Sequence, residues 1–284
     1  MAAVSFQCGR FELSFERPLV MGIVNVTPDS FSDGSLHFQA DQAIAHGLEL
    51  VRQGADILDI GGESTRPGAD PVSVEEELHR IVPVIEGLLH CGVPLSIDTF
   101  KPPVMVQALK VGADMINDIY GFRLPGALDA VADSRCGVCV MHMQGEPKTM
   151  QQAPVYEHLL NEVAGFLRER VDVLRQAGVS DRRIVLDPGC GFGKTVQQNY
   201  QLLHHFADLP VYGLPWLIGV SRKSMIGHII DRPPAQRVVG SVAAALAAVD
   251  RGAFIVRVHD VQETVDALKV WRAVQNGALP YVET

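Results

Sequence analysis

The sequence lacks any long apolar run. Its apolar stretches have the length of strands and fall far short of the roughly 20 residues that a membrane-spanning helix needs. No Gly/Ser/Pro-rich tract or block of like charge interrupts the 284 residues, so no linker between domains is expected. The residues Met1 to Val4 do not form a basic region followed by an apolar one, and we therefore expect no signal peptide.

Cysteine is also sparse. The five cysteines are odd in number and scattered, which argues against a disulfide framework and is typical of reduced thiols in a cytoplasmic protein. Cys136 and Cys139 have C-x-x-C spacing, but they lie in a strand-like run where positions three apart point to opposite faces. We therefore expect neither a redox nor a zinc role for this pair.

Positive charge is scarce as well. The formal net charge of −9 argues against broad nucleic-acid binding. A small anionic substrate remains compatible with it, provided that positive charge is concentrated locally or supplied by a metal ion. With 47% hydrophobic and 20% charged residues, the composition is that of a compact globular protein with an ample core.

Short apolar strands alternate with segments of helical period along the chain. The strands are continuous apolar runs, which is typical of a parallel sheet covered by helices. The expected strands are Val20–Val26, Asp56–Ile60, Pro94–Asp98, Met115–Ile119, Gly137–Met143, Arg183–Asp187, Trp216–Val220 and Phe254–Val258. The expected helices are about Asp41–Gln53, Val74–His90, Pro103–Val111, Gly126–Ser134, Tyr156–Gln176, Val196–Ala207, Ala235–Asp250 and Gln262–Gln275.

Eight such βα units predict an α/β fold that closes into a (β/α)₈ TIM barrel. An open, doubly wound sheet is the alternative, but the G-x-G-x-x-G fingerprint is missing after the first strand. Segments near 6–8 and 11–15 predict a short hairpin before the barrel. We expect one domain over 1–284, with the hairpin in 1–18, the barrel in 19–276 and a tail in 277–284.

All eight expected strands end in polar or ionisable residues. In a barrel, active sites form where strands end and βα loops begin. A single residue of this kind could be a satisfied core polar group, but eight at the same end are hard to explain by stability, because each buried polar group costs free energy unless it is paired. They include Asn25, Asp59, Asp98, Asn117, His142, Asp187, Lys223 and Arg257.

The sixth strand end is the most informative of these. Asp187 is followed directly by a glycine-rich turn, which suits a catalytic or binding carboxylate; the alternative is that Asp187 caps the next helix. The segment Gly193-Lys194-Thr195 looks like the end of a Walker A motif, but Pro188 stands where that motif needs glycine. We therefore do not expect a nucleotide P-loop.

The chemistry of the strand ends divides into two sets. Asp98, Asn117 and Asp187, together with Lys223, offer acceptors and donors suited to a flat heterocycle with several N–H and C=O groups. The second set offers donors to phosphate oxygens, with one oxygen ligand for a magnesium ion that phosphates help to hold. The phosphate donors are Arg66, Arg257 and His259, and the magnesium ligand is Asn25.

The segments that carry these residues resemble those of the dihydropteroate synthase family. The match runs in order from about Val20 to the last helix, which makes it highly specific. The segments are MGIVNVTPDSFSDG, DIGGESTRPGA, SIDT, INDI, VMHMQG, LDPGCGFGK, GVSRKSMIG and RVHDV.

The resemblance implies a (β/α)₈ barrel and a transferase of folate biosynthesis. In that reaction para-aminobenzoate displaces pyrophosphate from 6-hydroxymethyl-7,8-dihydropterin diphosphate and gives 7,8-dihydropteroate. The resemblance further implies a Mg²⁺ cofactor, sulfonamides as competitors of para-aminobenzoate, and a homodimer. No nucleic acid or membrane partner is expected.

The resemblance also implies a role for individual residues. The expected pterin contacts are Asp98, Asn117, Asp187 and Lys223. The expected diphosphate site is Asn25, Thr65, Arg66, Arg257 and His259, with Asn25 also the metal ligand. The expected aminobenzoate pocket is Phe31, Arg66, Pro67, Phe192, Lys223 and Ser224. The expected catalytic residues are Asp98, Lys223, Arg257 and His259.

Two related functions compete with this one. A methyltetrahydrofolate-binding methyltransferase domain is also a barrel with a pterin pocket, but Arg66 and Arg257-Val258-His259 favour a diphosphate leaving group. A catalytically silent pterin-binding paralogue would be expected to lose Arg66, Lys223 or Arg257, and this chain keeps all three. Three positions depart from the common family pattern: Ser35, Phe100 and Cys190.

Overall fold

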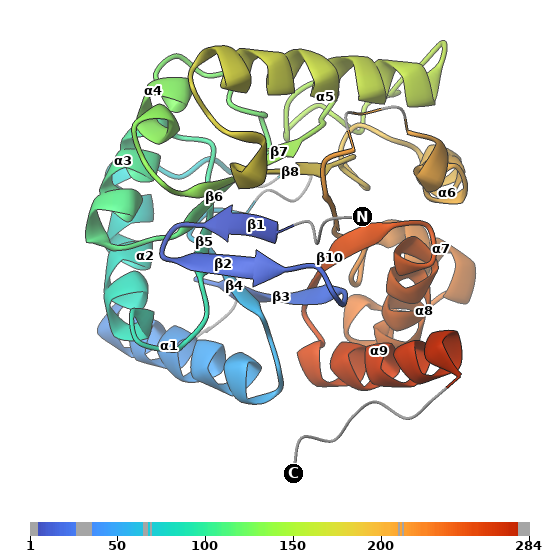
Figure 1. The fold of residues 1–284 in the computed structure, drawn as a ribbon, viewed down its shortest axis with the longest axis horizontal. Helices are drawn as coiled ribbons and strands as arrows, with labels where there is room; N and C mark the ends of the chain where they lie inside the picture. Colours follow the sequence, from blue (N-terminus) through green and yellow to red (C-terminus); the bar gives the residue numbers. More distant parts are fainter. Residues whose placement is uncertain are drawn as a thin grey trace.

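The chain forms a closed barrel of eight parallel strands surrounded by helices, with a two-stranded antiparallel hairpin at one end (Figure 1). This computed structural model describes residues 5–26, 36–64, 68, 70–209, 211 and 213–277, with 36–38 described by backbone alone. In neighbour order the closed sheet is β10-β3-β4-β5-β6-β7-β8-β9. The predicted barrel and hairpin are therefore confirmed. Within the described ranges no helix is long and apolar enough to cross a membrane.

The strands and helices alternate as the sequence predicts. The hairpin strands are β1 (Ser5–Cys8) and β2 (Phe11–Ser14). The barrel strands are β3 (Leu19–Asn25), β4 (Ile57–Gly61), β5 (Leu95–Asp98), β6 (Met115–Asp118), β7 (Gly137–Met141), β8 (Ile184–Asp187), β9 (Trp216–Ile218) and β10 (Ala253–Val258). The helices are α1 (Leu36–Arg52), α2 (Val74–Leu88), α3 (Pro102–Val111), α4 (Ala127–Ala132), α5 (Leu159–Gln176), α6 (Val196–His204), α7 (Ser224–Ile230), α8 (Val238–Val249) and α9 (Val261–Asn276). Short 3₁₀ turns are η2 (Asp181–Arg183), η3 (Phe206–Asp208) and η4 (Pro234–Gln236).

One helix was not predicted. After β9 the chain forms α7 before η4 and α8, so that two helices follow this strand where one was expected. The α7 sequence, Ser-Met-Ile-Gly-His-Ile-Ile, is only seven residues long and contains Gly227 and three β-branched isoleucines. Such a segment has weak helical propensity, so its helix depends on packing that the sequence alone does not reveal.

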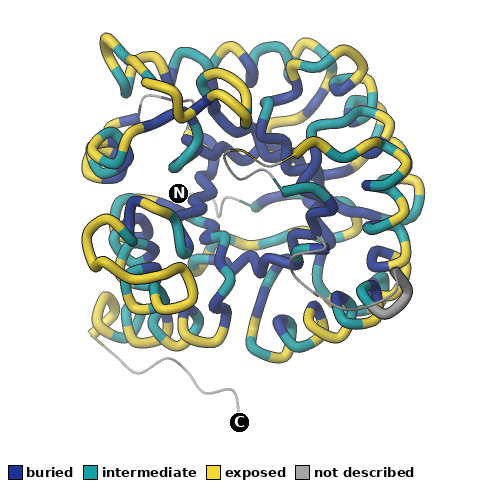
Figure 2. Tube along the Cα trace, turned by 180° about the vertical axis from the view of Figure 1, so that it is seen from behind, coloured by how far each residue is buried: buried dark blue, intermediate teal, exposed yellow. Residues whose placement is uncertain are grey.

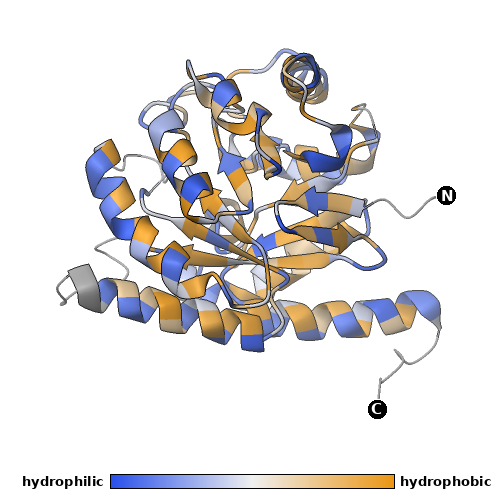
Figure 3. Ribbon diagram, turned by 60° about the vertical axis from the view of Figure 1, so that its left-hand side comes forward, coloured by the Kyte–Doolittle hydropathy of each residue, from blue (hydrophilic) through white to orange (hydrophobic). Residues whose placement is uncertain are grey.

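The outward-facing side chains of the strands pack against the helices. Strand residues such as Val24, Ile60 and Ile116 are buried in one large cluster with helix residues. Figure 2 shows the strands as a buried ring inside partly exposed helices. In Figure 3 the strands are mostly hydrophobic, whereas the helices alternate between hydrophobic and hydrophilic positions. This is the arrangement expected of a parallel barrel whose outer face is completely covered.

The inward-facing side chains form a separate apolar layer at the amino-terminal end of the barrel. It is closed by the hairpin, whose Phe6 and Cys8 are completely buried against it. The barrel side chains of this layer are Leu19, Met21, Ile57, Met115, Cys139, Val185, Leu217 and Ile255. Cys139 lies in this layer, whereas Cys136 packs in the cluster between sheet and helices. The two cysteines therefore point to opposite faces, as their spacing predicts.

The hairpin is anchored by a buried carboxylate at the start of β6. Asp114 Oδ1 accepts hydrogen bonds from the backbone N–H of Arg10 (3.1 Å) and from its Nε (2.9 Å), and Asp114 Oδ2 accepts one from its Nη2 (2.8 Å). Gly9 has a φ of +59°, and a Cβ there would lie 2.5 Å from Asp114 Oδ1. A left-handed glycine at the turn thus lets the hairpin approach closely enough to close the barrel.

Replacing Gly137 by alanine tests how tightly the hairpin fits. A Cβ at Gly137 would lie 2.5 Å from the Phe6 ring, so the hairpin that carries Phe6 must shift. We expect Gly137→Ala to lower the free energy of unfolding by about 1–3 kcal/mol in urea titrations. Gly165→Ala in α5 is the matched control, because a Cβ there meets nothing within 4 Å; it should be neutral or up to about 1 kcal/mol stabilising. Equal free energies of unfolding for the two variants would contradict the tight fit of the hairpin against β7.

Candidate functional site

A polar layer lies in the barrel interior directly above the apolar layer. Because side chains alternate across a strand, the inward positions two residues after Ile57, Met115, Val185 and Ile255 also face the barrel interior. Those positions hold Asp59, Asn117, Asp187 and Arg257. The barrel is thus apolar and closed at its amino-terminal end, and polar at the carboxyl ends of its strands.

Asp59 is the hub of this polar layer. It is completely buried, and its Oδ1 accepts a hydrogen bond from Ser96 Oγ (2.6 Å). Its Oδ2 accepts bonds from Asn117 Nδ2 (3.2 Å) and Arg257 Nε (2.6 Å). The sequence places Asp59 at a strand end but gives it no role. Its function in the fold is to hold a predicted pterin contact and a predicted phosphate contact in fixed positions.

Arg257 also binds the carboxylate at the end of β5. Its Nη2 donates to Asp98 Oδ2 at 2.8 Å. Burial by itself would lower the pKa of Arg257, but Asp59 and Asp98 outweigh it and raise that pKa. Burial raises the pKa of Asp98, and the Arg257 guanidinium opposes that rise. The guanidinium is therefore a fixed cation held between two carboxylates.

Asp98 Oδ1 is the one buried acceptor of the polar layer without a hydrogen-bond partner in the described part of the chain. An unpaired buried acceptor costs free energy that a donor from a ligand would recover. Next to it, a Cβ built on Gly61 would lie 3.9 Å from Asp98 Oδ2 and 4.0 Å from Asn25 Oδ1. Asn25, at the end of β3, and Asp98 thus border the same small space.

Asp187 faces the same interior from β8. It is 5% exposed, and its Oδ1 accepts a hydrogen bond from the N–H of Gly189 at 2.7 Å. Burial raises its pKa, against the opposing effect of Lys223. The helix α6 is instead capped by Thr195, which forms a reciprocal capping box with Gln198. Asp187 is therefore not the cap of the following helix.

Lys223, the residue before α7, reaches over the glycine-rich loop after β8. Its Nζ donates to the carbonyl oxygen of Cys190 and lies 4.8 Å from the centre of the Phe192 ring. Burial lowers its pKa, and Asp187 opposes that change. A Cβ built on Gly219 would lie 3.8 Å from both Lys223 Nζ and Arg257 Cβ. Gly219 therefore keeps space open between these two cations.

An apolar wall completes this end of the barrel, and the sequence analysis did not identify it. Phe192 packs on it, and so does Phe100, whose ring centroid lies 4.8 Å from that of Tyr120. Period-two alternation continued beyond Asn117 could have pointed to Ile119, the next inward position. The buried members of the wall are Ile119, Met141, Met143 and Met150.

The remaining predicted site residues fall into two groups. His259 Nδ1 lies 3.0 Å from Ser221 Oγ, which places the imidazole at the carboxyl end of β10, and Ser224 is exposed at the first position of α7. Arg222, which follows Ser221 in the chain, has a φ of +57°, and its Nε donates to Asp260 Oδ2. The other predicted site residues lie outside the described residues: Phe31, Thr65, Arg66 and Pro67.

Two polar strand ends stabilise loops instead of entering the polar layer. Asp118 accepts hydrogen bonds from the N–H groups of Tyr120 and Phe122, both at 2.7 Å. His142 Nδ1 lies 3.0 Å from Lys194 Nζ beneath the glycine-rich loop. The rule that polar strand ends mark the site thus holds for most strands, while these two residues shape the loops around it.

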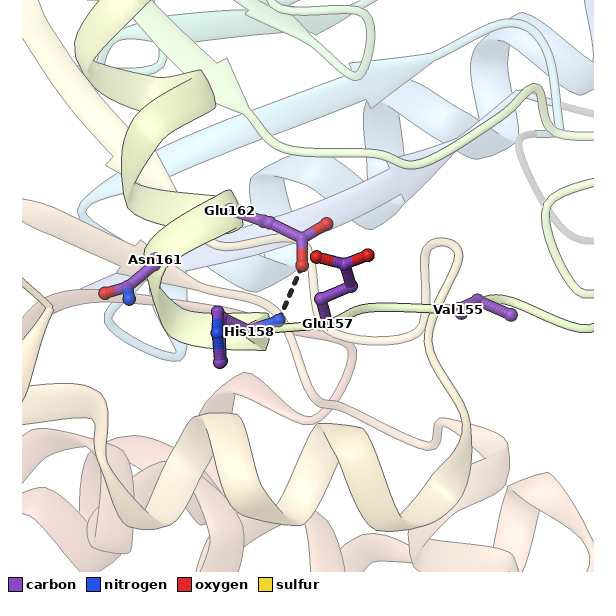
Figure 4. Close-up of a pocket in the computed structure, with 5 residues that line it drawn as sticks. All are labelled: Val155, Glu157, His158, Asn161 and Glu162. Atoms are coloured by element: carbon purple, nitrogen blue, oxygen red, sulfur yellow. Dashed lines mark hydrogen bonds between the residues drawn. The ribbon is translucent and has the colours of Figure 1, made fainter.

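A separate surface depression of about 480 Å³ lies at the start of α5 (Figure 4). Two of its lining residues are joined by a hydrogen bond from the His158 N–H to Glu162 Oε1 at 2.8 Å. None of the predicted site residues lines it, and it is shallow and open to solvent. Its lining residues are Val155, Glu157, His158, Asn161 and Glu162. Nothing in this depression suggests chemistry.

Comparisons with known proteins agree with this geometry. The family profile described as "Pterin binding enzyme" matches residues 21–259. The dihydropteroate synthase of Escherichia coli strain K12 is 50% identical over 262 residues, covering 92% of this chain and 93% of that protein.

Solved structures extend the likeness to three dimensions. The Burkholderia cenocepacia dihydropteroate synthase complexed with 7,8-dihydropteroate is 54% identical, with a TM-score of 0.89 over 97% of this chain and 98% of that one. The Xanthomonas albilineans dihydropteroate synthase with 4-aminobenzoic acid is 54% identical, with a TM-score of 0.91 over 98% of this chain and 100% of that one. The chain belongs to the pterin-binding enzyme family and, within it, to the dihydropteroate synthases.

Proposed function

We propose that the chain condenses 6-hydroxymethyl-7,8-dihydropterin diphosphate with para-aminobenzoate to give 7,8-dihydropteroate and pyrophosphate. The observation that carries this proposal is the polar layer, where carboxylates and an amide surround a space bordered by two cations. Asp98, Asn117 and Asp187 supply the acceptors, and Lys223 and Arg257 supply the positive charge.

The pterin ring binds at the floor of the barrel. Asp187 and Asp98 accept from its ring and exocyclic N–H groups, and the unpaired Asp98 Oδ1 gains the donor that it lacks. Asn117 gives its Nδ2 to Asp59, so its oxygen is the atom available to a donor on the pterin. Asp187 and Lys223 together match a C=O group next to an N–H group, which a pterin carries on one edge.

The diphosphate binds at the rim, with Arg257 near the end of β10 and His259 directly after it. Arg66 is assigned there from the sequence, and Thr65 by the resemblance alone. Breaking the carbon–oxygen bond leaves positive charge on the pterin methylene and negative charge on pyrophosphate. Arg257 and His259 stabilise the leaving group, and the carboxylate of Asp98 stabilises the developing cation. Because Asp59 already fixes Arg257, little reorganisation is needed when this charge develops.

The amine arrives from the side of the glycine-rich loop. The Phe192 ring, with Lys223 Nζ 4.8 Å from its centre, forms an aromatic face next to a cation that suits the ring and carboxylate of para-aminobenzoate. Ser224 adds a hydroxyl at the start of α7. Sulfonamides compete for the same place, and Phe31, Arg66 and Pro67 complete it by resemblance.

A magnesium ion fits the site only together with the substrate. The described residues contain no group of three or more His, Cys, Asp or Glu side chains that could hold a metal ion. Asn25 offers one oxygen beside Asp98, and magnesium commonly takes one or two protein ligands plus phosphate oxygens. When bound, the ion would neutralise charge on the diphosphate, with Asn25 as its protein ligand.

An assay of pyrophosphate release tests the proposed function directly. Release should require both the pterin diphosphate and para-aminobenzoate, and it should yield dihydropteroate in equal amount. A methyltransferase-like barrel would instead transfer a methyl group from methyltetrahydrofolate, and a silent paralogue would bind pterin without releasing pyrophosphate. Either result would overturn the proposal.

Replacing Asp187 by asparagine removes a charged acceptor from the pterin floor. We expect the pterin Kd, measured by calorimetry, to rise about 10- to 100-fold, because a hydrogen bond to a charged group contributes about 1.5–3 kcal/mol. The melting temperature should stay near that of the wild type. Asp129→Asn, at an exposed position in α4, is the control and should leave the Kd unchanged. An unaltered pterin Kd in Asp187→Asn would contradict the assignment.

Replacing Asn25 by alanine tests the magnesium ligand. The Mg²⁺ concentration that gives half-maximal activity should rise about tenfold, because a ligand oxygen is lost while the phosphate oxygens remain. Asn161→Ala, exposed in α5, is the control. If half-maximal activity needs the same Mg²⁺ concentration in both variants and the wild type, Asn25 is not a ligand.

The exposed apolar residues of the described chain gather on three consecutive helices, which supports a homodimer. Of the eight large hydrophobic residues that are exposed in the described part of the chain, five lie on α7, α8 and α9. α7 packs against α8, and α8 packs against α9. The five residues are Ile229, Ile230, Val239, Val270 and Val274.

Light scattering at micromolar concentration should give twice the mass of one chain. Val239→Asp should shift the measured mass toward that of a single chain. A monomeric wild type would contradict the homodimer.

A further inference from the structure

The lysine of the Walker-like segment in the glycine-rich loop is turned inward and buried. Lys194 is only 2% exposed, and its Nζ contacts three acceptors. They are His142 Nδ1 (3.0 Å), the Gly189 carbonyl oxygen (3.0 Å) and the Phe192 carbonyl oxygen (3.1 Å). This lysine therefore joins both ends of the loop to the strand end beneath it.

The imidazole in this cluster is an acceptor. Burial and the nearby Lys194 lower the pKa of His142 to about 2, so its ring is neutral at physiological pH. Burial also lowers the pKa of Lys194 to about 7. Only the ammonium form has three N–H groups, which matches the three acceptors around it. The cluster is thus fully satisfied when Lys194 carries its proton.

The other carbonyl groups of the loop are also bound. Cys190 accepts from Lys223, Gly191 accepts from Gln151 Nε2 (2.6 Å), and Gly193 accepts from Tyr156 Oη (2.7 Å). Every carbonyl oxygen from Gly189 to Gly193 therefore has a side-chain donor. Loops are usually mobile, whereas these bonds hold this one in a single shape.

Only glycine allows the loop to lie this close to the end of β7. Gly189 has a φ of +70°, and a Cβ there would lie 1.8 Å from the His142 carbonyl oxygen. A Cβ on Gly193 would lie 2.5 Å from the Gln144 carbonyl oxygen. The loop rests directly on this backbone, and Lys194 fastens it there from below.

What the loop presents to the site is one face of the aminobenzoate pocket. Phe192 and the Cys190 carbonyl together set the position of Lys223 Nζ. The Asp187 carbonyl oxygen accepts from the His142 N–H at 3.0 Å, and its Oδ1 accepts from the Gly189 N–H at the start of the loop. Phe192 faces only para-aminobenzoate in the proposed function, whereas the pterin is also held by Asp98 and Asn117, which bond to Arg257 and Asp59 away from the loop. A change in loop shape would therefore affect the binding of para-aminobenzoate more than that of the pterin, which keeps two contacts that do not involve the loop.

We propose that Lys194 is a positioning residue, which sets the affinity for para-aminobenzoate through the shape of the glycine-rich loop without contacting either substrate. The inference rests on the proposed function, because it needs Phe192 and Lys223 to face para-aminobenzoate. A purely structural lysine would change the stability and leave the two substrates equally affected.

The test compares Lys194→Met and Lys194→Gln with Lys110→Met, an exposed lysine of α3. Methionine keeps the length of the side chain and donates nothing, whereas glutamine keeps two N–H donors. Lys194→Met should raise the KM for para-aminobenzoate at least tenfold and the KM for the pterin diphosphate several-fold less, because Asp98 and Asn117 hold the pterin independently of the loop. Lys194→Gln should fall between Lys194→Met and the wild type, and Lys110→Met should match the wild type.

Pyrophosphate release by the wild type in the same assay tests the proposed function separately from this inference. Melting temperatures and calorimetric titration with para-aminobenzoate show whether each variant is folded and binds. Equal changes in the two KM values, or none, would overturn the positioning role of Lys194. Failure of both Lys194 variants to fold would also overturn it, in favour of a structural role alone.

Discussion

The arginine held between two buried carboxylates is the interaction on which the site depends. Arg257 on β10 binds Asp59 on β4 and Asp98 on β5, so it joins strands that are far apart in the sequence. Removing Arg257 would leave two buried carboxylates without a counter-charge, which is strongly destabilising. Here the network fixes both the Arg257 guanidinium and, through Asp59, the hydrogen bond that orients Asn117.

The amino-terminal end of the barrel is closed, so the polar layer is open at the carboxyl ends of the strands. Phe6 and the apolar inward layer fill the amino-terminal end, and the Asp114–Arg10 bonds hold the hairpin in place. In the described part of the chain, the polar layer is therefore open toward the loop side. In the proposed function, the heterocycle lies deep because its acceptors are on strands, and the second substrate lies above it because Phe192 and Lys223 are on loops. Depth along the barrel axis thus separates the two substrate positions.

The barrel and most of the strand-end residues could be predicted from the sequence, because period and strand spacing report directly on which side chains face inward. The short α7 could not be predicted, since Gly227 and its isoleucines give no strong helical signal. The hub role of Asp59 and the loop-stabilising roles of Asp118 and His142 were also hidden. Those roles depend on which residue each side chain contacts across the barrel or within a loop. The stagger of the strands and the packing of the loops determine these contacts. The Lys194 cluster likewise needs a tertiary contact between two βα loops.

We propose that this layer of fixed charges separates pyrophosphate from the pterin methylene before the amine attacks. Positional isotope exchange measures that step most directly. Pterin diphosphate carrying oxygen-18 in the bridge between carbon and phosphorus is incubated with enzyme and Mg²⁺ but no para-aminobenzoate, and is then recovered. If the bond breaks first, the label moves into non-bridging positions of the recovered diphosphate. A label that stays entirely in the bridge, with an enzyme that turns over normally once para-aminobenzoate is added, would contradict it.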